Sequence, residues 1–159
     1  MTDVAGLKVD GLSMRYRSAN KPVFSNLSFD LARSGRLAIL GRNGQGKSTL
    51  IRLLGGIQGA TSGSIRWNMS RSWPIGFGGG FQGSLSGLDN IKFISRIYNR
   101  DYREAFDRVE SFAELGRALA LPVKHYSSGM RARLAFGLSL AIEFDCYLID
   151  ELVAVGDAR

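Results

Sequence analysis

The sequence predicts an α/β fold with a mainly parallel central sheet, and three features indicate it. Residues 37–40 (LAIL) and 146–149 (CYLI) are short, uninterrupted apolar runs. Such runs are typical of strands that are buried on both faces of a parallel sheet. A glycine-rich turn and then a segment with helical spacing follow the first run. The alternation of strand and helix is characteristic of α/β proteins.

The composition indicates one folded domain. The 159 residues can enclose a hydrophobic core, and 45% of them are apolar. The net charge of +7 suits a polyanionic partner, but the lysines and arginines are scattered, which argues against a nucleic-acid-binding arm. No apolar stretch reaches the roughly 18 residues of a membrane-spanning helix, and the N-terminus does not resemble a signal peptide. We therefore expect a cytoplasmic location, and the single cysteine, Cys146, cannot form an internal disulfide.

The N-terminal third predicts two strands and a helix. Residues 4–9 and 23–31 alternate between apolar and polar side chains, as half-buried strands do. A helix is expected from about Lys47 to the glycines between residues 55 and 59. Its apolar side would consist of Leu50, Leu53, Leu54 and Ile57.

The remainder of the chain predicts helices bounded by short irregular segments. Residues 61–86 are rich in glycine, serine and aromatic side chains, which favours short strands and loops. Two helices are expected between residues 88 and 120, with Arg100 and Asp101 between them. Another helix is expected over residues 128–142, where apolar residues recur every four positions.

A phosphate-binding loop is the most specific motif. GRNGQGKST, residues 41–49, fits the pattern G-x-x-x-x-G-K-[ST] between a predicted strand and a predicted helix. Its glycines let the backbone wrap closely around phosphate with N–H groups pointing inward. Lys47 would reach the β- and γ-phosphates, Ser48 would bind Mg²⁺, and Thr49 would add a phosphate contact. The ATP-binding residues expected in this loop are Gly41, Asn43, Gly44, Gly46, Lys47, Ser48 and Thr49.

A pair of acids, Asp150 and Glu151, follows the second apolar run. Strands of open α/β sheets place ligand-binding groups at their carboxyl ends. Asp150 would hold Mg²⁺, and Glu151 would polarise the attacking water as general base. Alone, the pair is better interpreted as a strand end with two solvated acids. A phosphate-binding loop in the same chain favours the catalytic interpretation.

The stretch YSSGM, residues 126–130, precedes the last predicted helix. Taken alone it favours a serine N-cap over an anion site at the helix start. Together with the two preceding motifs, it resembles the signature LSGGQ of the nucleotide-binding subunits of ATP-binding cassette (ABC) transporters. The resemblance implies that Ser127 and Gly129 contact the γ-phosphate of ATP on the opposite subunit, with Ser128 beside them. A homodimer would then enclose two ATP molecules.

The same resemblance suggests roles for further residues. Tyr16 stands where the family has its adenine-stacking aromatic, although a half-buried strand residue is an equal alternative. Gln82 matches the Q-loop glutamine, which reaches Mg²⁺ and the attacking water near the membrane partner. Asp157 matches an aspartate of the dimer interface. His125 matches no catalytic position, and we expect it on the surface.

Three longer stretches resemble the ATPase subunits of capsular polysaccharide exporters: residues 72–98, 126–141 and 147–158. The resemblance implies a single ABC nucleotide-binding domain over residues 1–159, with a β-rich N-terminal part and a helical subdomain at about 83–142. It would power polysaccharide export through an integral membrane permease at the cytoplasmic face of the inner membrane. ATP and Mg²⁺ would be its cofactors, and nucleic acid would not be a partner.

The chain departs from that family in one respect. The family continues beyond the position of Arg159 with more sheet and a switch histidine, whereas the single histidine here, His125, lies upstream. We therefore expect a C-terminally truncated domain with weak hydrolysis and an unpaired sheet edge. Two alternatives remain open: a non-catalytic remnant that binds nucleotide, and a soluble ABC ATPase that acts on nucleic acid or ribosomes.

Overall fold

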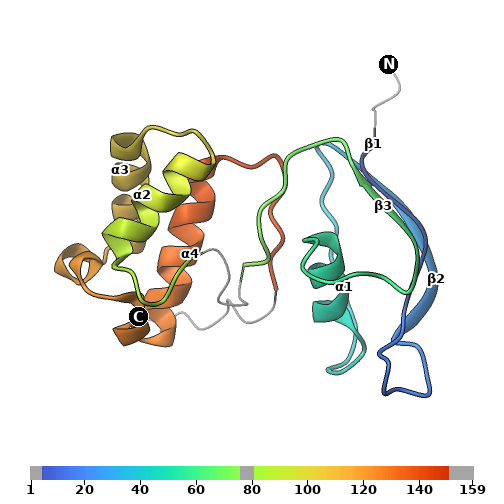
Figure 1. Ribbon diagram of the computed structural model, residues 1–159. Helices are drawn as coiled ribbons and strands as arrows, with labels where there is room; N and C mark the ends of the chain where they lie inside the picture. Colours follow the sequence, from blue (N-terminus) through green and yellow to red (C-terminus); the bar gives the residue numbers. More distant parts are fainter. Residues whose placement is uncertain (1–4, 76–80, 151–159) are drawn as a thin grey trace. The chain divides into compact units, whose positions relative to one another are not determined.

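The computed structural model describes residues 5–75 and 81–150 (Figure 1). The chain forms two compact units, Met1–Arg71 and Ser72–Arg159. We call them the N-terminal unit and the helical unit, and each is described by itself.

The N-terminal unit contains a three-stranded antiparallel sheet. Its strands are β1 (Ala5–Met14), β2 (Phe24–Ala32) and β3 (Ser62–Trp67), in the spatial order β2-β1-β3. Val9 of the central strand β1 is buried. It pairs with Phe29 of β2 on one side and with Ile65 of β3 on the other. A slip of one residue would turn such an apolar set toward solvent, so the apolar pattern fixes the register.

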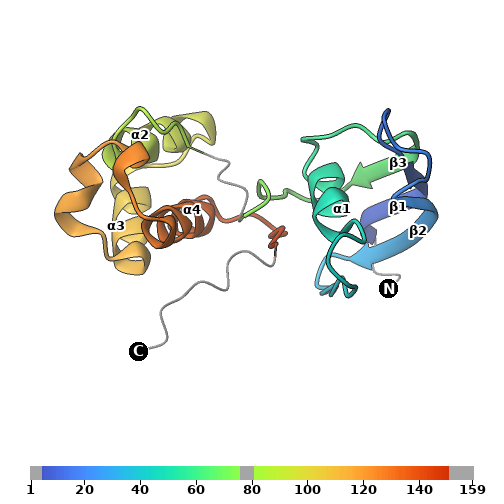
Figure 2. The same ribbon diagram turned by 90° about the horizontal axis from the view of Figure 1, so that it is seen from below.

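The helix α1 (Lys47–Leu54) lies beside this sheet in both views (Figures 1 and 2). The side chains of Leu50, Leu53 and Leu54 are buried. The Trp67 indole of β3 donates a hydrogen bond of 3.1 Å to the Leu54 carbonyl. These contacts fix the helix, and with it the end of the glycine-rich turn that leads into it.

Three helices dominate the helical unit: α2 (Gly87–Ile97), α3 (Tyr102–Ala113) and α4 (Ser128–Ile142). Two short 3₁₀ segments, Gly116–Ala120 and Val123–His125, lie between α3 and α4. Each helix begins at a side-chain cap of the expected type, in order Ser86, Asp101 and Ser127. The helices enclose an apolar core whose fully buried members include Ile91, Val109, Val123, Leu134 and Leu138.

The close packing of α3 against α4 depends on a glycine. A Cβ atom on Gly137 would lie 3.3 Å from the Cα of Val109, tighter than an ordinary van der Waals contact. No helix in the described part of the chain is long and apolar enough to cross a membrane.

The α/β character and most predicted elements are confirmed. The structure has the two N-terminal strands, the helix that starts at Lys47, two helices separated by residues 98–101, and the helix over 128–142. All of the described helices of the helical unit lie within residues 83–142, the range given for a helical subdomain.

The predicted strand at residues 37–40 is wrong. These residues have no regular secondary structure, and Leu37 and Leu40 are 49% and 91% exposed. A strand needs neighbours that satisfy its N–H and C=O groups. The sheet that the described residues of this unit form is antiparallel and offers no parallel neighbour, so the apolar run has no partner there.

Two further details differ from the prediction. Ile57 lies beyond the end of α1 and is 60% exposed, because the helix ends at Gly55. Residues 146–149 form no regular strand, but they run parallel to residues 72–75 with a bridge between Ile75 and Ile149. This is the parallel pairing found in the described residues, and Ile149 is 53% exposed.

Candidate nucleotide-binding site

The glycine-rich loop encloses the ammonium group of Lys47. The Lys47 Nζ donates to the carbonyl oxygens of Gly41 at 2.7 Å and of Arg42 at 3.2 Å. The Asn43 side-chain oxygen lies at 3.5 Å from the same nitrogen. Gln45 steadies the loop from within, since its Oε1 accepts from the Arg42 N–H at 3.0 Å. The loop therefore curls around a positive charge.

Two glycines give the loop its path. Gly44 and Gly46 have φ angles of 83° and 94°, in the region that favours glycine. At Gly46 a Cβ atom would also overlap the Cγ1 of Val23. A side chain at this position would push the loop away from the strand side of the unit.

The start of α1 is built to receive an anion. Gly46 is its N-cap and supplies no side-chain cap, and the first turn contains no acidic residue. The first N–H groups of a helix lack intrahelical acceptors, and the helix dipole places partial positive charge there. Ser48 lies in this turn and is partly exposed, whereas Thr49 is 7% exposed. A phosphate group is the natural ligand for such a helix start.

Tyr16 lies against this helix. It follows the end of β1, and its hydroxyl is 3.1 Å from the Thr49 Oγ1. Hydrogen bonding to Thr49, and secondarily to Gln58, lowers the pKa of the Tyr16 phenol. The backbone beside it is held as well, because the Arg15 N–H donates to the Thr61 hydroxyl at 2.9 Å. Tyr16 is 39% exposed, and it lies beyond the end of β1, so it is not a strand residue.

In the helical unit, the backbone of Gln82 is held by a buried amide. Asn90 is 0% exposed, and its Oδ1 accepts from the Gln82 N–H at 2.7 Å. Its Nδ2 donates to the Gln82 carbonyl at 3.0 Å. The Gln82 residue itself is exposed. The sequence pattern did not predict this role of Asn90; the available signal was an amide within an apolar helical pattern.

Ser127 caps α4, as the simpler interpretation of the stretch predicts. Its Oγ accepts from the Met130 N–H at 3.2 Å. The preceding Tyr126 is buried, donates to the Ala118 carbonyl at 2.7 Å, and has its pKa raised by burial. Ser128 is exposed and Gly129 is partly exposed, so the small residues of this helix start are accessible.

Asp150 ends the parallel pairing of the helical unit. Its N–H donates to the Ile75 carbonyl at 3.1 Å, and the residue is 4% exposed. Cys146, in the same segment, is a free cysteine whose thiol pKa is raised mainly by burial. His125 is exposed, as expected. Glu151 and Asp157 lie outside the described residues.

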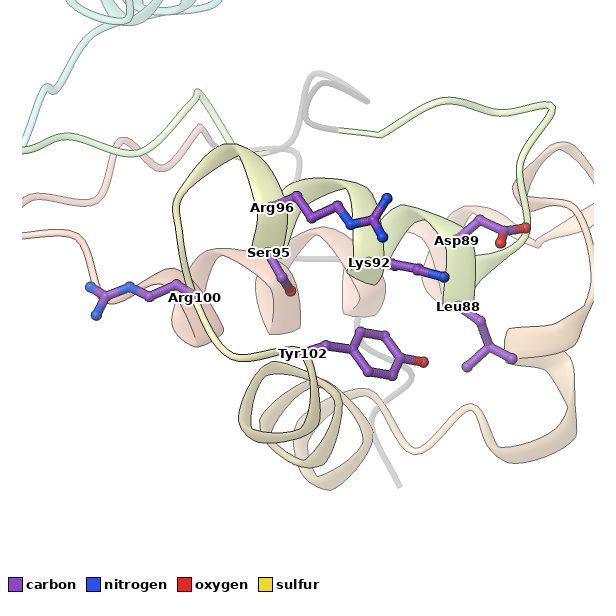
Figure 3. A pocket seen from close by; sticks show the side chains of 7 residues that line it. All are labelled: Leu88, Asp89, Lys92, Ser95, Arg96, Arg100 and Tyr102. Carbon is purple, nitrogen blue, oxygen red and sulfur yellow. The ribbon is translucent and has the colours of Figure 1, made fainter.

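A separate pocket of about 350 Å³ lies on the helical unit, between α2 and the start of α3 (Figure 3). Lys92 and Arg96 of α2, Tyr102 of α3 and Arg100 between the two helices are among the residues that line it, and the Arg100 side chain is directed away from the other three (Figure 3). The pocket contains no residue predicted for nucleotide binding.

The predicted site residues are thus divided between the two units. Those in the N-terminal unit are Tyr16, Gly41, Asn43, Gly44, Gly46, Lys47, Ser48 and Thr49. The helical unit carries Gln82, Ser127, Ser128, Gly129 and Asp150. No cluster of three or more histidine, cysteine, aspartate or glutamate residues that could hold a metal occurs among the described residues.

Comparison with known proteins identifies the family of this chain. Residues 24–154 match the protein family described as ABC transporter. The chain belongs to the ABC transporter family. As a member with the nucleotide-binding motifs, it is an ATPase subunit of the ABC type.

Curated relatives of this ABC subunit are similar over 96% of its length. It is 56% identical to the capsule polysaccharide export ATP-binding protein CtrD of Neisseria meningitidis serogroup B, of which it covers 72%. It is 52% identical to the ATP-binding protein BexA of Haemophilus influenzae, of which it covers 71%. It is 48% identical to the polysialic acid transport ATP-binding protein KpsT of Escherichia coli, of which it covers 70%.

Solved ABC structures have the same fold. A metal-chelate type ABC transporter in an inward-facing conformation matches with a TM-score of 0.71 and 28% identity, over 96% of this chain and 63% of that one. An ATP-binding subunit of another ABC transporter matches with a TM-score of 0.75 and 22% identity, over 92% of this chain and 69% of that one. The second match bears on the fold alone.

Proposed function

We propose that this protein is the ATP-hydrolysing subunit of an exporter that moves capsular or related surface polysaccharide across the inner membrane. The observation that carries the proposal is the loop that encloses Lys47 at the uncapped start of α1. It occurs in a chain 56% identical to a capsule polysaccharide export ATP-binding protein. The scattered positive charge does not favour the alternative of an ATPase that acts on nucleic acid.

ATP binding would exchange one set of Lys47 partners for another. The loop carbonyls of Gly41 and Arg42 now accept from the ammonium group. Phosphate oxygens carry more negative charge than carbonyls and form stronger, charge-assisted hydrogen bonds. The β- and γ-phosphates would therefore replace these carbonyls as hydrogen-bond acceptors of Lys47. The loop N–H groups and the start of α1 would bind the remaining phosphate oxygens.

The residues proposed for Mg²⁺ match its chemistry. Ser48, Gln82 and Asp150 offer a hydroxyl, an amide oxygen and a carboxylate, and Mg²⁺ prefers hard oxygen ligands together with water. A bound Mg²⁺ would neutralise charge that develops on the phosphates. Glu151 would orient and polarise the attacking water, and Gln82 would assist it.

The accessible small residues at the start of α4 fit a role across a dimer. In our proposal, Ser127, Ser128 and Gly129 approach the γ-phosphate bound to a second subunit, and Asp157 lies at the same interface. Closure of the dimer on ATP would drive a membrane-spanning permease, and hydrolysis would reset it. The protein would then work at the cytoplasmic face of the membrane, bound through that permease.

A genetic replacement tests the proposal. Deletion of the gene should remove the polysaccharide from the cell surface, and the wild-type protein should restore it. Lys47→Ala should leave the glycan inside the cell, whereas Lys8→Ala, which changes an exposed lysine of β1, should restore export. Normal surface polysaccharide with Lys47→Ala, or in the deletion strain, would contradict the proposal.

A further inference from the structure

The loop that carries Gln82 is bonded to a buried side chain. Asn90, in the first turns of α2, is 0% exposed. Its amide bonds the N–H of Gln82 at 2.7 Å and the carbonyl of Gln82 at 3.0 Å. The same Nδ2 lies 2.8 Å from the Ser86 carbonyl and 3.5 Å from that of Leu85. One amide thus ties both ends of the segment 82–86 to the helix.

The bonds to Gln82 determine more than its position. The N–H and the carbonyl of one residue belong to the two peptide groups that flank its Cα. When both are held by a rigid, buried amide, the orientation of both peptide planes is fixed, and so is the direction of the Cα–Cβ bond. The exposed Gln82 side chain therefore leaves the loop in a defined direction.

Other contacts also hold the loop, and one of them reaches Gln82 itself, whose carbonyl accepts from the Leu85 N–H at 3.1 Å. The Gly83 carbonyl accepts from the Lys124 N–H at 2.8 Å, and the Leu85 carbonyl accepts from the Val123 N–H at 2.9 Å. These bonds secure the loop one and three residues beyond Gln82. Among the described residues, Asn90 supplies the side-chain hydrogen bonds to the Gln82 backbone.

We propose that Asn90 is a positioning residue for Gln82: its buried amide sets the direction in which the Gln82 side chain reaches toward the reacting phosphate, Mg²⁺ or water. The inference rests on the proposed function, in which Gln82 assists hydrolysis. Asn90 acts through Gln82 and touches no nucleotide. A misplaced catalytic group can lower the rate of the chemical step by one or two orders of magnitude while substrate binding is retained.

The test is a double-mutant cycle in the assembled exporter, with kcat and KM for ATP as readouts. We expect Asn90→Ala and Asn90→Asp to lower kcat by about tenfold or more and to change KM for ATP less than about twofold. Asn90→Asp keeps the size and the acceptor of the side chain but loses both donors, so it carries the test if Asn90→Ala does not fold. In a Gln82→Ala background, either Asn90 variant should lower kcat no further.

Ser95→Ala provides the matched control. Ser95 is a buried polar residue of the same helix, 2% exposed, whose hydroxyl donates to the Ile91 carbonyl within that helix at 2.7 Å. It should leave kcat unchanged.

If the wild-type exporter hydrolyses ATP, either of two results would overturn this inference and leave the proposed function intact. One is a wild-type kcat in the folded Asn90 variants; the other is an equal loss of kcat from the Asn90 change with and without Gln82. An exporter with no ATPase activity in its wild-type form would refute the proposed function, and this inference with it.

Discussion

The Lys47 ammonium nitrogen lies 2.7 Å from the carbonyl oxygen of Gly41, so the last part of the glycine-rich loop closes on its first residue. The loop is thereby curled around the side chain of Lys47, with the Arg42 carbonyl as a second acceptor at 3.2 Å.

Lys47→Ala should weaken ATP binding by at least about tenfold, because it removes the charge-assisted hydrogen bonds to the phosphates. Titration with a fluorescent ATP analogue in the presence of Mg²⁺ measures the affinity. Lys8→Ala serves as the control for loss of one positive charge elsewhere on the N-terminal unit and should bind as the wild type does. Equal affinities of the two variants for ATP would show that Lys47 does not bind the phosphates.

Gly46→Ala should destabilise the N-terminal unit by roughly 1–3 kcal/mol, since the residue has a φ of 94° and its new Cβ would overlap Val23. The free energy of unfolding in urea is the quantity to measure. Gly59→Ala is the matched control, because no atom lies within 4 Å of its added Cβ and its φ is not positive. Equal stabilities of the two variants would show that the loop tolerates a side chain at position 46.

Tyr16→Ala should weaken ATP binding several fold, whereas Tyr16→Phe should bind ATP about as the wild type does. Phenylalanine keeps the stacking ring and loses only the hydroxyl that lies 3.1 Å from the Thr49 Oγ1, a bond within the protein, whereas alanine loses both. Stacking of a base on an aromatic ring contributes about 1–3 kcal/mol when measured by alanine substitution. Tripolyphosphate has no base, so its affinity should be the same in all three proteins. A parallel loss of tripolyphosphate affinity would mean that Tyr16 supports the phosphate loop and does not stack on adenine.

Ser127→Ala should lower the stability of the helical unit by about 1 kcal/mol, because it removes the N-cap of α4. Ser128→Ala, one residue into the helix, should change the stability by less than about 0.5 kcal/mol. Thermal melts followed by circular dichroism separate the two. If the two variants melt alike, the cap contributes nothing, and a role of Ser127 in nucleotide contact becomes the remaining reason for its place.

The parts of the fold that depend on neighbouring residues could be predicted from the sequence. The cap at Ser127, the end of α1 at Gly55 and the loop around Lys47 all follow from residue types a few positions apart. The strand at 37–40 could not be predicted correctly, because burial of Leu40 depends on partners that the apolar run itself does not specify.

The same distinction applies to the site. Lys47 and Ser48 belong to a local motif, and the structure places them at the start of α1 as expected. The role of Asn90 was missed, because it arises only when residues 82–86 fold back on the helix that follows them. A buried amide in a helical pattern is a polar group that needs a partner, and the sequence does not say which one.

The most direct test of the central claim is ATP-dependent movement of polysaccharide into inverted inner-membrane vesicles that contain this protein and its permease. The account predicts uptake with ATP and Mg²⁺, no uptake with a non-hydrolysable ATP analogue, and no uptake with the Lys47→Ala protein. Uptake at the wild-type rate without ATP, or with the Lys47→Ala protein, would contradict it.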